Sequence, residues 1–215
     1  MVLTPRARAR LDYLDRKLVL EHAPARVRVV DAPTLGRGAA VERALSEASR
    51  ALLGLRRRRL DPAGARLYYY PYWLYTVEFS VRALPLWRLS THTAALAVDG
   101  LNGHTTFADR VPGWRWHDAG PGDRVKLFVD GRTADRLVDQ ELPRLAAVSL
   151  GGHVVRARRR GRLLVYKPIW AVVAREPSGR TAAVIVDAIT GGVGVVWYPR
   201  GRRLPEVFQG AAGGG

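Results

Sequence analysis

The sequence predicts an α+β protein of two tandem, related helix-plus-antiparallel-sheet units, preceded by an N-terminal helix–strand extension. Two aromatic blocks, "YYPYW" (69–73) and "YKPIW" (166–170), share Tyr, Pro and Trp at the same spacing, 97 residues apart. Two further blocks, "AALAVDGLNG" (94–103) and "AAVIVDAITG" (182–191), align at a shift of 88 residues. Such self-similarity indicates an internal duplication, or tandem repeat. Its signature residues are Tyr69, Pro71, Trp73, Asp99 and Gly103 in the first copy and Tyr166, Pro168, Trp170, Asp187 and Gly191 in the second.

The duplication predicts how the chain is divided. The expected segments are an N-terminal extension (1–36), repeat unit 1 (37–110), a linker (111–131), repeat unit 2 (132–205) and a flexible tail (206–215). Thr4-Pro5 suits a helix start, because proline is tolerated at the first helical position. A strand is expected near Val27–Val30. The stretch "DRVPGWRWHDAGPGDR" is rich in glycine and proline, which favours a boundary between the two copies.

Each copy is expected to begin with a helix that is followed by about three antiparallel strands. In the first copy a helix over about 39–53 would place Val41, Leu45, Ala48 and Leu52 on one face. In the second copy Thr133 is expected to cap a helix whose Val138, Leu142 and Leu145 share a face. Pro143 is expected to kink that helix or to begin a second short one.

The aromatic stretch "LYYYPYWLYTVEF" (67–79) predicts a strand, although a proline lies within it. Proline has no N–H to donate to a neighbouring strand and is usually confined to strand edges and bulges. Because Pro71 recurs as Pro168, we expect both to mark an edge or bulge where the sheet bends. The missing N–H would then face water or interrupt the row of hydrogen bonds between neighbouring strands.

The block "VDAITG", placed after a helix and two strands, resembles the PepSY-type domain, whose repeats close on a similar hairpin. The preceding "YKPIW" is similar to a Leu-Pro-x-Trp strand of small bacterial domains that are often fused to zinc ribbons or membrane helices. The resemblance covers 39–109 and 133–198. It implies a small α+β unit used for binding or inhibition, with no catalytic residues to carry over. The chain departs from these contexts, since it shows neither cysteines nor a signal or transmembrane segment.

The composition excludes several classes of site. The chain has no cysteine, which rules out disulfides, thiolate nucleophiles, zinc ribbons and iron–sulfur clusters. No apolar run is long enough to span a membrane, and the start lacks the apolar region of an export signal. We therefore expect a cytoplasmic protein that binds no cofactor.

Asp99 and Asp187 are the two carboxylates that recur. Each is expected to accept hydrogen bonds from backbone N–H groups of the turn that follows it, while Gly103 and Gly191 adopt a positive φ. A catalytic pair would need partners and a cleft, and a calcium loop would need more oxygens than one carboxylate supplies. The five histidines show no metal-binding or catalytic spacing, and no nucleotide-binding or hydrolase motif is present. The sequence therefore predicts no catalytic, cofactor-binding or metal-binding residue.

Positive charge is concentrated at the two ends of the chain. The net charge is +16, and residues 1–60 and 151–215 each carry +8 while the middle is neutral. Two arginine runs are candidates for binding an anion or nucleic acid, namely Arg56, Arg57, Arg58 and Arg59, and Arg156, Arg158, Arg160 and Arg162. On a strand the second set would project to one side, and such a row can neutralise several phosphates. A solvated sheet face in an arginine-rich protein is the alternative.

Exposed aromatics would add to the nucleic-acid hypothesis, because bases stack on them. Trp114 and Trp116 flank Arg115, and tyrosines alternate along 68–72. Packing within the sheet is the favoured explanation for the alternating tyrosines.

The sequence predicts a non-catalytic, basic binding or adaptor protein that docks a protein partner or a polyanion through its sheets and arginine-rich surfaces. The polyanion could be a nucleic acid or an anionic membrane surface. A nucleic-acid-binding or ribosome-associated protein is the alternative, and an uncharacterised enzyme comes third.

Overall fold

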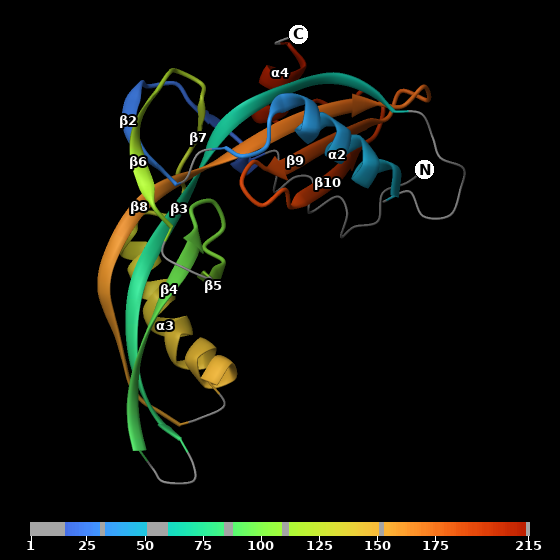
Figure 1. Ribbon diagram of the computed structural model, residues 1–215. Helices are drawn as coiled ribbons and strands as arrows, with labels where there is room; N and C mark the ends of the chain where they lie inside the picture. The colour runs from blue at the N-terminus through green and yellow to red at the C-terminus, as the bar shows by residue number, and fades with distance from the viewer. Residues whose placement is uncertain are drawn as a thin grey trace. The chain divides into compact units, whose positions relative to one another are not determined.

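The computed structural model describes residues 16–30, 33–50, 60–83, 88–108, 112–150 and 153–213 (Figure 1). The strands of these ranges are β1 (Leu20–Glu21), β2 (Ala25–Val30), β3 (Asp61–Ala83), β4 (Arg88–Asp99), β5 (Thr105–Ala108), β6 (Trp114–Ala119), β7 (Arg124–Val125), β8 (His153–Arg175), β9 (Thr181–Asp187) and β10 (Val193–Tyr198). The helices are α2 (Arg37–Arg50), α3 (Gly131–Leu150) and α4 (Glu206–Ala212).

The ten strands of the described residues form one mixed sheet. Six of them follow the order β1-β7-β3-β8-β2-β6, while β4 and β5 extend from β3, and β9 and β10 extend from β8. The β3–β7 pair is parallel at Tyr69 and Arg124, whereas β3–β4, β4–β5, β8–β9 and β9–β10 are antiparallel. The predicted α+β fold of two tandem helix-plus-antiparallel-sheet units is therefore wrong.

The length of β3 and β8 explains why the predicted division into two separate sheets is wrong. Each strand has 23 residues, whereas strands in globular proteins usually have about 5–6. The chain divides into unit 1 (1–70, 116–126 and 167–215) and unit 2 (71–115 and 127–166), and both long strands contribute to both units. Strands that pair with either part of β3 or β8 consequently join the same sheet.

Two further expectations concern segments outside the repeats. The strand predicted near Val27–Val30 is β2, whereas the residues of the predicted N-terminal helix up to 15 lie outside the described part of the chain. The segment expected to be a linker contributes β6 and β7. Residues 206–212, expected in a flexible tail, form α4, which buries Val207, Phe208 and Ala211.

Unit 2 packs α3 against β4 and β5. β3 pairs with β4 from Tyr72 opposite Asp99 onward, and β4 pairs with β5. Alternate residues of a strand point to the same face, so every second residue of β3 and β4 can reach the helix. The buried core of this unit is formed by Tyr75, Val77, Phe79, Leu96, Val98, Val129, Ala134, Val138 and Leu142.

Unit 1 packs α2 against β9 and β10. β8 pairs with β9 from Ile169 opposite Asp187 onward, and β9 pairs with β10. The buried core of this unit is formed by Ala44, Ala48, Leu60, Ala65, Val172, Ala174, Ala182, Val184 and Val186. α2 thus packs against a hairpin from the second half of the chain, and α3 packs against a hairpin from the first half. In the predicted tandem units each helix instead packed against the strands that follow it.

The faces of the helices differ in detail from the prediction. α2 buries Ala40, Ala44 and Ala48, while the predicted Val41 and Leu45 pack at the margin of the core. Leu52 and the side chain of Leu145 lie outside the described residues. α3 is one helix that continues past Pro143, so the second short helix is absent from this segment.

Trp73 and Trp170 tie the starts of the two helices to the sheet. The Trp73 indole N–H donates to the Val129 carbonyl at 2.7 Å, and the Trp170 indole N–H donates to the Leu35 carbonyl at 2.8 Å. Each carbonyl stands two residues before the first residue of its helix. The tryptophan of the Tyr-x-Pro-x-Trp block therefore has the same contact in both units.

Pro71 lies where β3 changes its neighbour along one edge. Tyr69 pairs with β7, and the pairing with β4 begins at Tyr72. Pro71 thus lies between the hydrogen bonds to β7 and those to β4. A missing N–H costs little at such a position, because neither strand has a carbonyl opposite it. Pro71 is buried rather than facing water, and its carbonyl accepts a hydrogen bond from Gly100 N–H at 3.0 Å. Of the two alternatives, interruption of the ladder describes this position.

Candidate anion-binding surface

The structure places one of the two predicted arginine runs. Arg156, Arg158, Arg160 and Arg162 lie in the part of β8 that belongs to unit 2. Arg56, Arg57, Arg58 and Arg59 lie outside the described residues. The candidate surface is therefore built from β8 and from the elements of unit 2 that surround it.

Arg160 forms a bidentate ion pair with Glu78 of β3. Its Nε and Nη2 atoms donate to the two carboxylate oxygens at 3.0 and 2.9 Å. The hydrogen bonds and charge of Glu78 raise the pKa of Arg160. A fork that is already filled by a carboxylate is a poorer site for a phosphate than an unpaired one.

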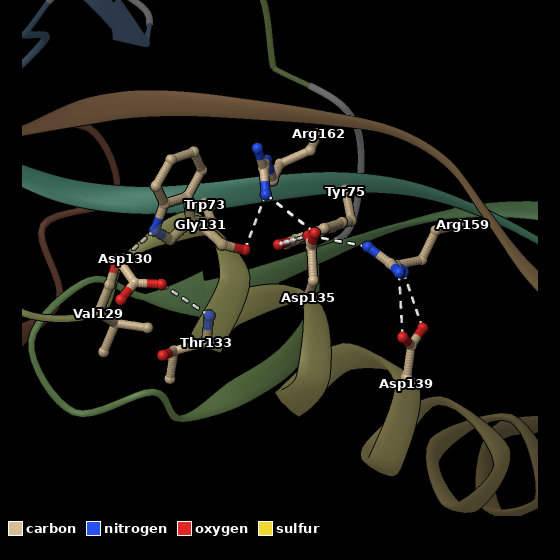
Figure 2. Close-up of polar contacts among 10 residues, drawn as sticks. All are labelled: Trp73, Tyr75, Val129, Asp130, Gly131, Thr133, Asp135, Asp139, Arg159 and Arg162. Carbon is tan, nitrogen blue, oxygen red and sulfur yellow. Dashed lines mark hydrogen bonds and ion pairs between the residues drawn. The ribbon is translucent and has the colours of Figure 1, made fainter.

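Arg159 and Arg162 converge on Asp135 of α3, as Figure 2 shows. Arg159 Nη1 lies 2.8 Å from one carboxylate oxygen and Arg162 Nη1 lies 3.0 Å from the other. Arg159 also donates to both oxygens of Asp139 at 2.7 and 3.0 Å. Burial alone would lower the pKa of Arg159, but the hydrogen bonds to Asp139 and Asp135 outweigh it and raise this pKa.

The shared contact with Asp135 differs from what strict alternation along β8 would predict. Residues three apart in a regular strand point to opposite faces, yet Arg159 and Arg162 reach the same carboxylate. Gly161 lies between them, and glycine within a strand often marks a local departure from the ladder. Of the four arginines predicted to form one row, Arg160 thus pairs with Glu78 of β3 and Arg162 pairs with Asp135 of α3.

Tyr75 completes the polar network. Its hydroxyl donates to Asp135 at 2.8 Å (Figure 2). Burial, and then this hydrogen bond, raise the pKa of the Tyr75 phenol. Burial alone would raise the pKa of Asp135 as well, but the hydrogen bonds from Tyr75 and Arg159 and the two arginine charges keep it below the ordinary value.

The same network surrounds the first turn of α3. Asp130 caps the helix by accepting a hydrogen bond from Thr133 N–H at 2.8 Å, so the predicted cap at Thr133 is wrong. Arg162 donates to the Gly131 carbonyl at 2.8 Å, and its guanidinium carbon lies 5.1 Å from the centre of the Trp73 ring. A Cβ at Gly131 would come within 2.7 Å of Arg162 Nη1, so a larger residue at this position would displace the guanidinium.

Arg156 and Arg158 remain available at this surface. Both side chains are exposed, and the described part of the chain shows no ion pair to either of them. Arg158 borders an open groove of about 690 Å³, which is lined by Tyr75, Asp135, Asp139, Ala157, Arg158, Arg159, Arg160, Gly161 and Arg162. Four arginines against two aspartates leave the lining with a formal charge of +2.

Several residues that organise this surface were not predicted from the sequence. Arg159 was left out of the set of candidate arginines, and Asp135, Asp139 and Tyr75 were not identified. The signal available was the pair of aspartates four residues apart, which share one helix face and can meet a neighbouring arginine run.

An exposed aromatic and cationic cluster lies in unit 1. Trp116 of β6 keeps 46% of its surface exposed. The guanidinium carbons of Arg26 and Arg28, both in β2, lie 5.4 and 4.6 Å from the centre of its ring. Trp114, also predicted as a stacking residue, is 43% exposed. By contrast Tyr68 is completely buried, in keeping with the packing explanation for the alternating tyrosines.

Asp99 and Asp187 have the turn contacts expected from the sequence. One oxygen of each accepts hydrogen bonds from the backbone N–H groups two and three residues further on, at 2.8 to 3.2 Å. Gly103 and Gly191 adopt φ values of 76° and 72°. Asp187 also pairs with Lys167. Burial alone would raise the pKa of Asp187, but Lys167 and the turn hydrogen bonds lower it.

Within the described ranges, no group of three or more His, Asp or Glu side chains is arranged to hold a metal ion. In the same ranges no helix is both long enough and apolar enough to cross a membrane.

Comparison with known proteins gives this chain no relative. No family model, curated protein or solved structure matches it. The resemblance to PepSY-type domains stays a prediction.

Proposed function

We propose that this protein is a non-catalytic binding protein for an anionic polymer, which it contacts through β8. The observation that carries the proposal is the exposure of Arg156 and Arg158, to which the described residues offer no carboxylate. Unpaired guanidinium groups bind phosphate or sulfate well, because no existing ion pair has to be broken.

The arrangement around these two arginines supports the proposal. Arg159 and Arg162 are held by α3, and Arg160 is held by Glu78, so the strand that carries Arg156 and Arg158 is fixed on both sides. The groove bordered by Arg158 has an excess of positive charge, as has the whole chain. Long-range attraction of a polyanion follows from such an excess.

Binding of heparin and of a short DNA duplex tests the proposal. The double variant Arg156→Ala/Arg158→Ala should weaken both interactions, because two phosphate or sulfate contacts are lost. In a plot of log affinity against log salt for the duplex, the slope should become less negative by about 1.8. Fluorescence anisotropy over a salt series measures both quantities.

The matched control removes the same number of charges elsewhere. Arg50 and Arg144 are exposed and paired with Glu47 and Glu141, so Arg50→Ala/Arg144→Ala lowers the net charge equally without touching β8. An equal loss in both double variants would show that net charge, not β8, is responsible. Absence of any binding by the unmodified protein at about 50 mM salt would overturn the proposal.

A further inference from the structure

The cluster of Trp116, Arg26 and Arg28 lies at the end of the sheet in unit 1. β6 is the last strand of the order β1-β7-β3-β8-β2-β6 and pairs with β2. Arg26 and Arg28 are two residues apart in β2 and therefore project to the same side of that strand. Their guanidinium carbons both lie within 5.4 Å of the centre of the Trp116 ring.

An exposed indole in contact with two cations has a defined orientation. Cation–π contacts at exposed sites contribute about 0.5–1 kcal/mol each, enough to favour one placement of a surface side chain. A ring that is already oriented loses less conformational entropy when a ligand stacks on it. Because 46% of Trp116 stays exposed, surface for such a ligand remains.

The chemistry of the cluster matches one nucleotide of a single strand. A nucleotide presents an aromatic base and, a short distance away, a phosphate, whereas the cluster presents an aromatic ring and two nearby guanidinium groups. Bases in a duplex are stacked on each other and cannot offer a free face, while bases of a single strand can. Asp118, two residues after Trp116 in β6, is the acidic residue on the same side of the strand.

We infer that Trp116 is a stacking platform for a base of single-stranded nucleic acid, with Arg26 and Arg28 contacting the adjoining phosphates. The inference rests on the proposed function and names its anionic polymer. It predicts that the protein prefers single strands to a duplex of equal charge, because only the single strand can use the indole.

Anisotropy with labelled oligo(dT) and oligo(U), beside a blunt duplex and heparin, tests this inference. Trp116→Ala should lower affinity for the single strands by about five- to 150-fold, which is the range for losing one stacked base. Affinity for the duplex and for heparin should change less than about twofold. Trp116→Phe, which keeps an aromatic ring, should restore part of the loss, whereas a purely structural role of the indole would not be selective for single strands.

Two matched variants sharpen the result. Phe128→Ala removes another exposed aromatic side chain and should leave single-strand affinity unchanged. Asp118→Asn should tighten binding, since it removes a negative charge from the side of β6 that would face the phosphates.

The outcomes separate this inference from the proposed function. If Trp116→Ala binds single strands as well as the unmodified protein does, the inference is overturned. The proposed function then still holds if Arg156→Ala/Arg158→Ala weakens heparin binding. If the unmodified protein binds neither heparin nor any oligonucleotide, both are overturned.

Discussion

Unit 1 and unit 2 attach a helix to the sheet with the same hydrogen bond but surround it with different side chains. In unit 2 the bond from Trp73 is surrounded by Tyr75, Asp135 and Arg162; the corresponding residues around Trp170 in unit 1 are Val172, Val41 and Ala65. The correspondence follows from position. Tyr75 and Val172 stand two residues after the tryptophan, and Asp135 and Val41 stand six residues after the accepting carbonyl. Ala65 and Arg162 are 97 residues apart, the shift that relates the two aromatic blocks.

The difference separates two roles of the polar network. Val172 and Ala65 are buried in the core of unit 1, and Val41 packs against it, so apolar side chains suffice to seat a helix there. Partly exposed ion pairs contribute only about 0–1 kcal/mol each to stability. The charges of unit 2 therefore add little to helix attachment, and their larger effect is to position arginines along the groove of β8.

The largest expected effect concerns the bond that both units share. Trp73→Phe and Trp170→Phe each remove the indole donor and leave a partly buried carbonyl unpaired, which should cost about 1–3 kcal/mol in either case. Urea denaturation of the two variants measures the loss. Trp116→Phe, at an exposed position, serves as the control and should change stability by less than about 0.5 kcal/mol. A loss of stability in only one of the two variants would show that the two indole hydrogen bonds are not equivalent.

A smaller effect is expected when the polar network of unit 2 is made apolar. Asp135→Val alone leaves the Tyr75 hydroxyl without its acceptor and removes one acceptor each from Arg159 and Arg162, which should cost about 1–3 kcal/mol. Adding Tyr75→Phe, which keeps the buried ring, and Arg162→Ala removes two of the groups that lost this acceptor, so the triple variant should be more stable than Asp135→Val. The same denaturation measurement applies. A triple variant less stable than Asp135→Val would show that unit 2 depends on its charges.

The smallest effect is a difference in pH dependence. In the folded protein the pKa of Asp135 is lowered below the ordinary value of about 3.9. Its contribution to the free energy of unfolding is therefore complete above that value and is lost as the pH falls through the folded pKa. Asp135→Asn should therefore flatten the decline of the melting temperature between about pH 5 and pH 2. Asp187 of unit 1 also has a lowered pKa and should preserve part of the decline. An unchanged decline in Asp135→Asn would contradict the role assigned to this carboxylate.

Local structure could be predicted from the sequence because its signals are local. Helical periodicity identified α2 and α3, and the recurring Asp and Gly identified the two hairpin turns. The choice of partners could not be predicted in this way. The apolar stripe of α2 fits any apolar sheet face, and nothing within it specifies β9 and β10 rather than the strands that follow it along the chain.

The candidate surface was predicted only in part, for a related reason. The arginines of β8 were visible as a run, but only Arg156, Arg158, Arg160 and Arg162 were selected from it, so Arg159 was left out. Asp135 and Asp139 are separated from that run by about twenty residues of sequence, and only the packing of α3 brings them together with it. Trp116 was identified because it flanks Arg115 together with Trp114, whereas Arg26 and Arg28 lie in a different strand and were not associated with it.

The packing of each long helix against strands from the other half of the chain has a consequence for folding during synthesis. The bond from Trp73 to Val129 spans 56 residues, whereas the bond from Trp170 to Leu35 spans 135. The segments of unit 2 leave a ribosome one after another, so this unit can close while the chain is still growing. α2 emerges early but must wait for β9 and β10, and each doubling of the intervening loop costs about 0.6 kcal/mol in closure entropy. We therefore expect folding to proceed from the middle of the chain outward, with α2 among the last of the described elements to pack.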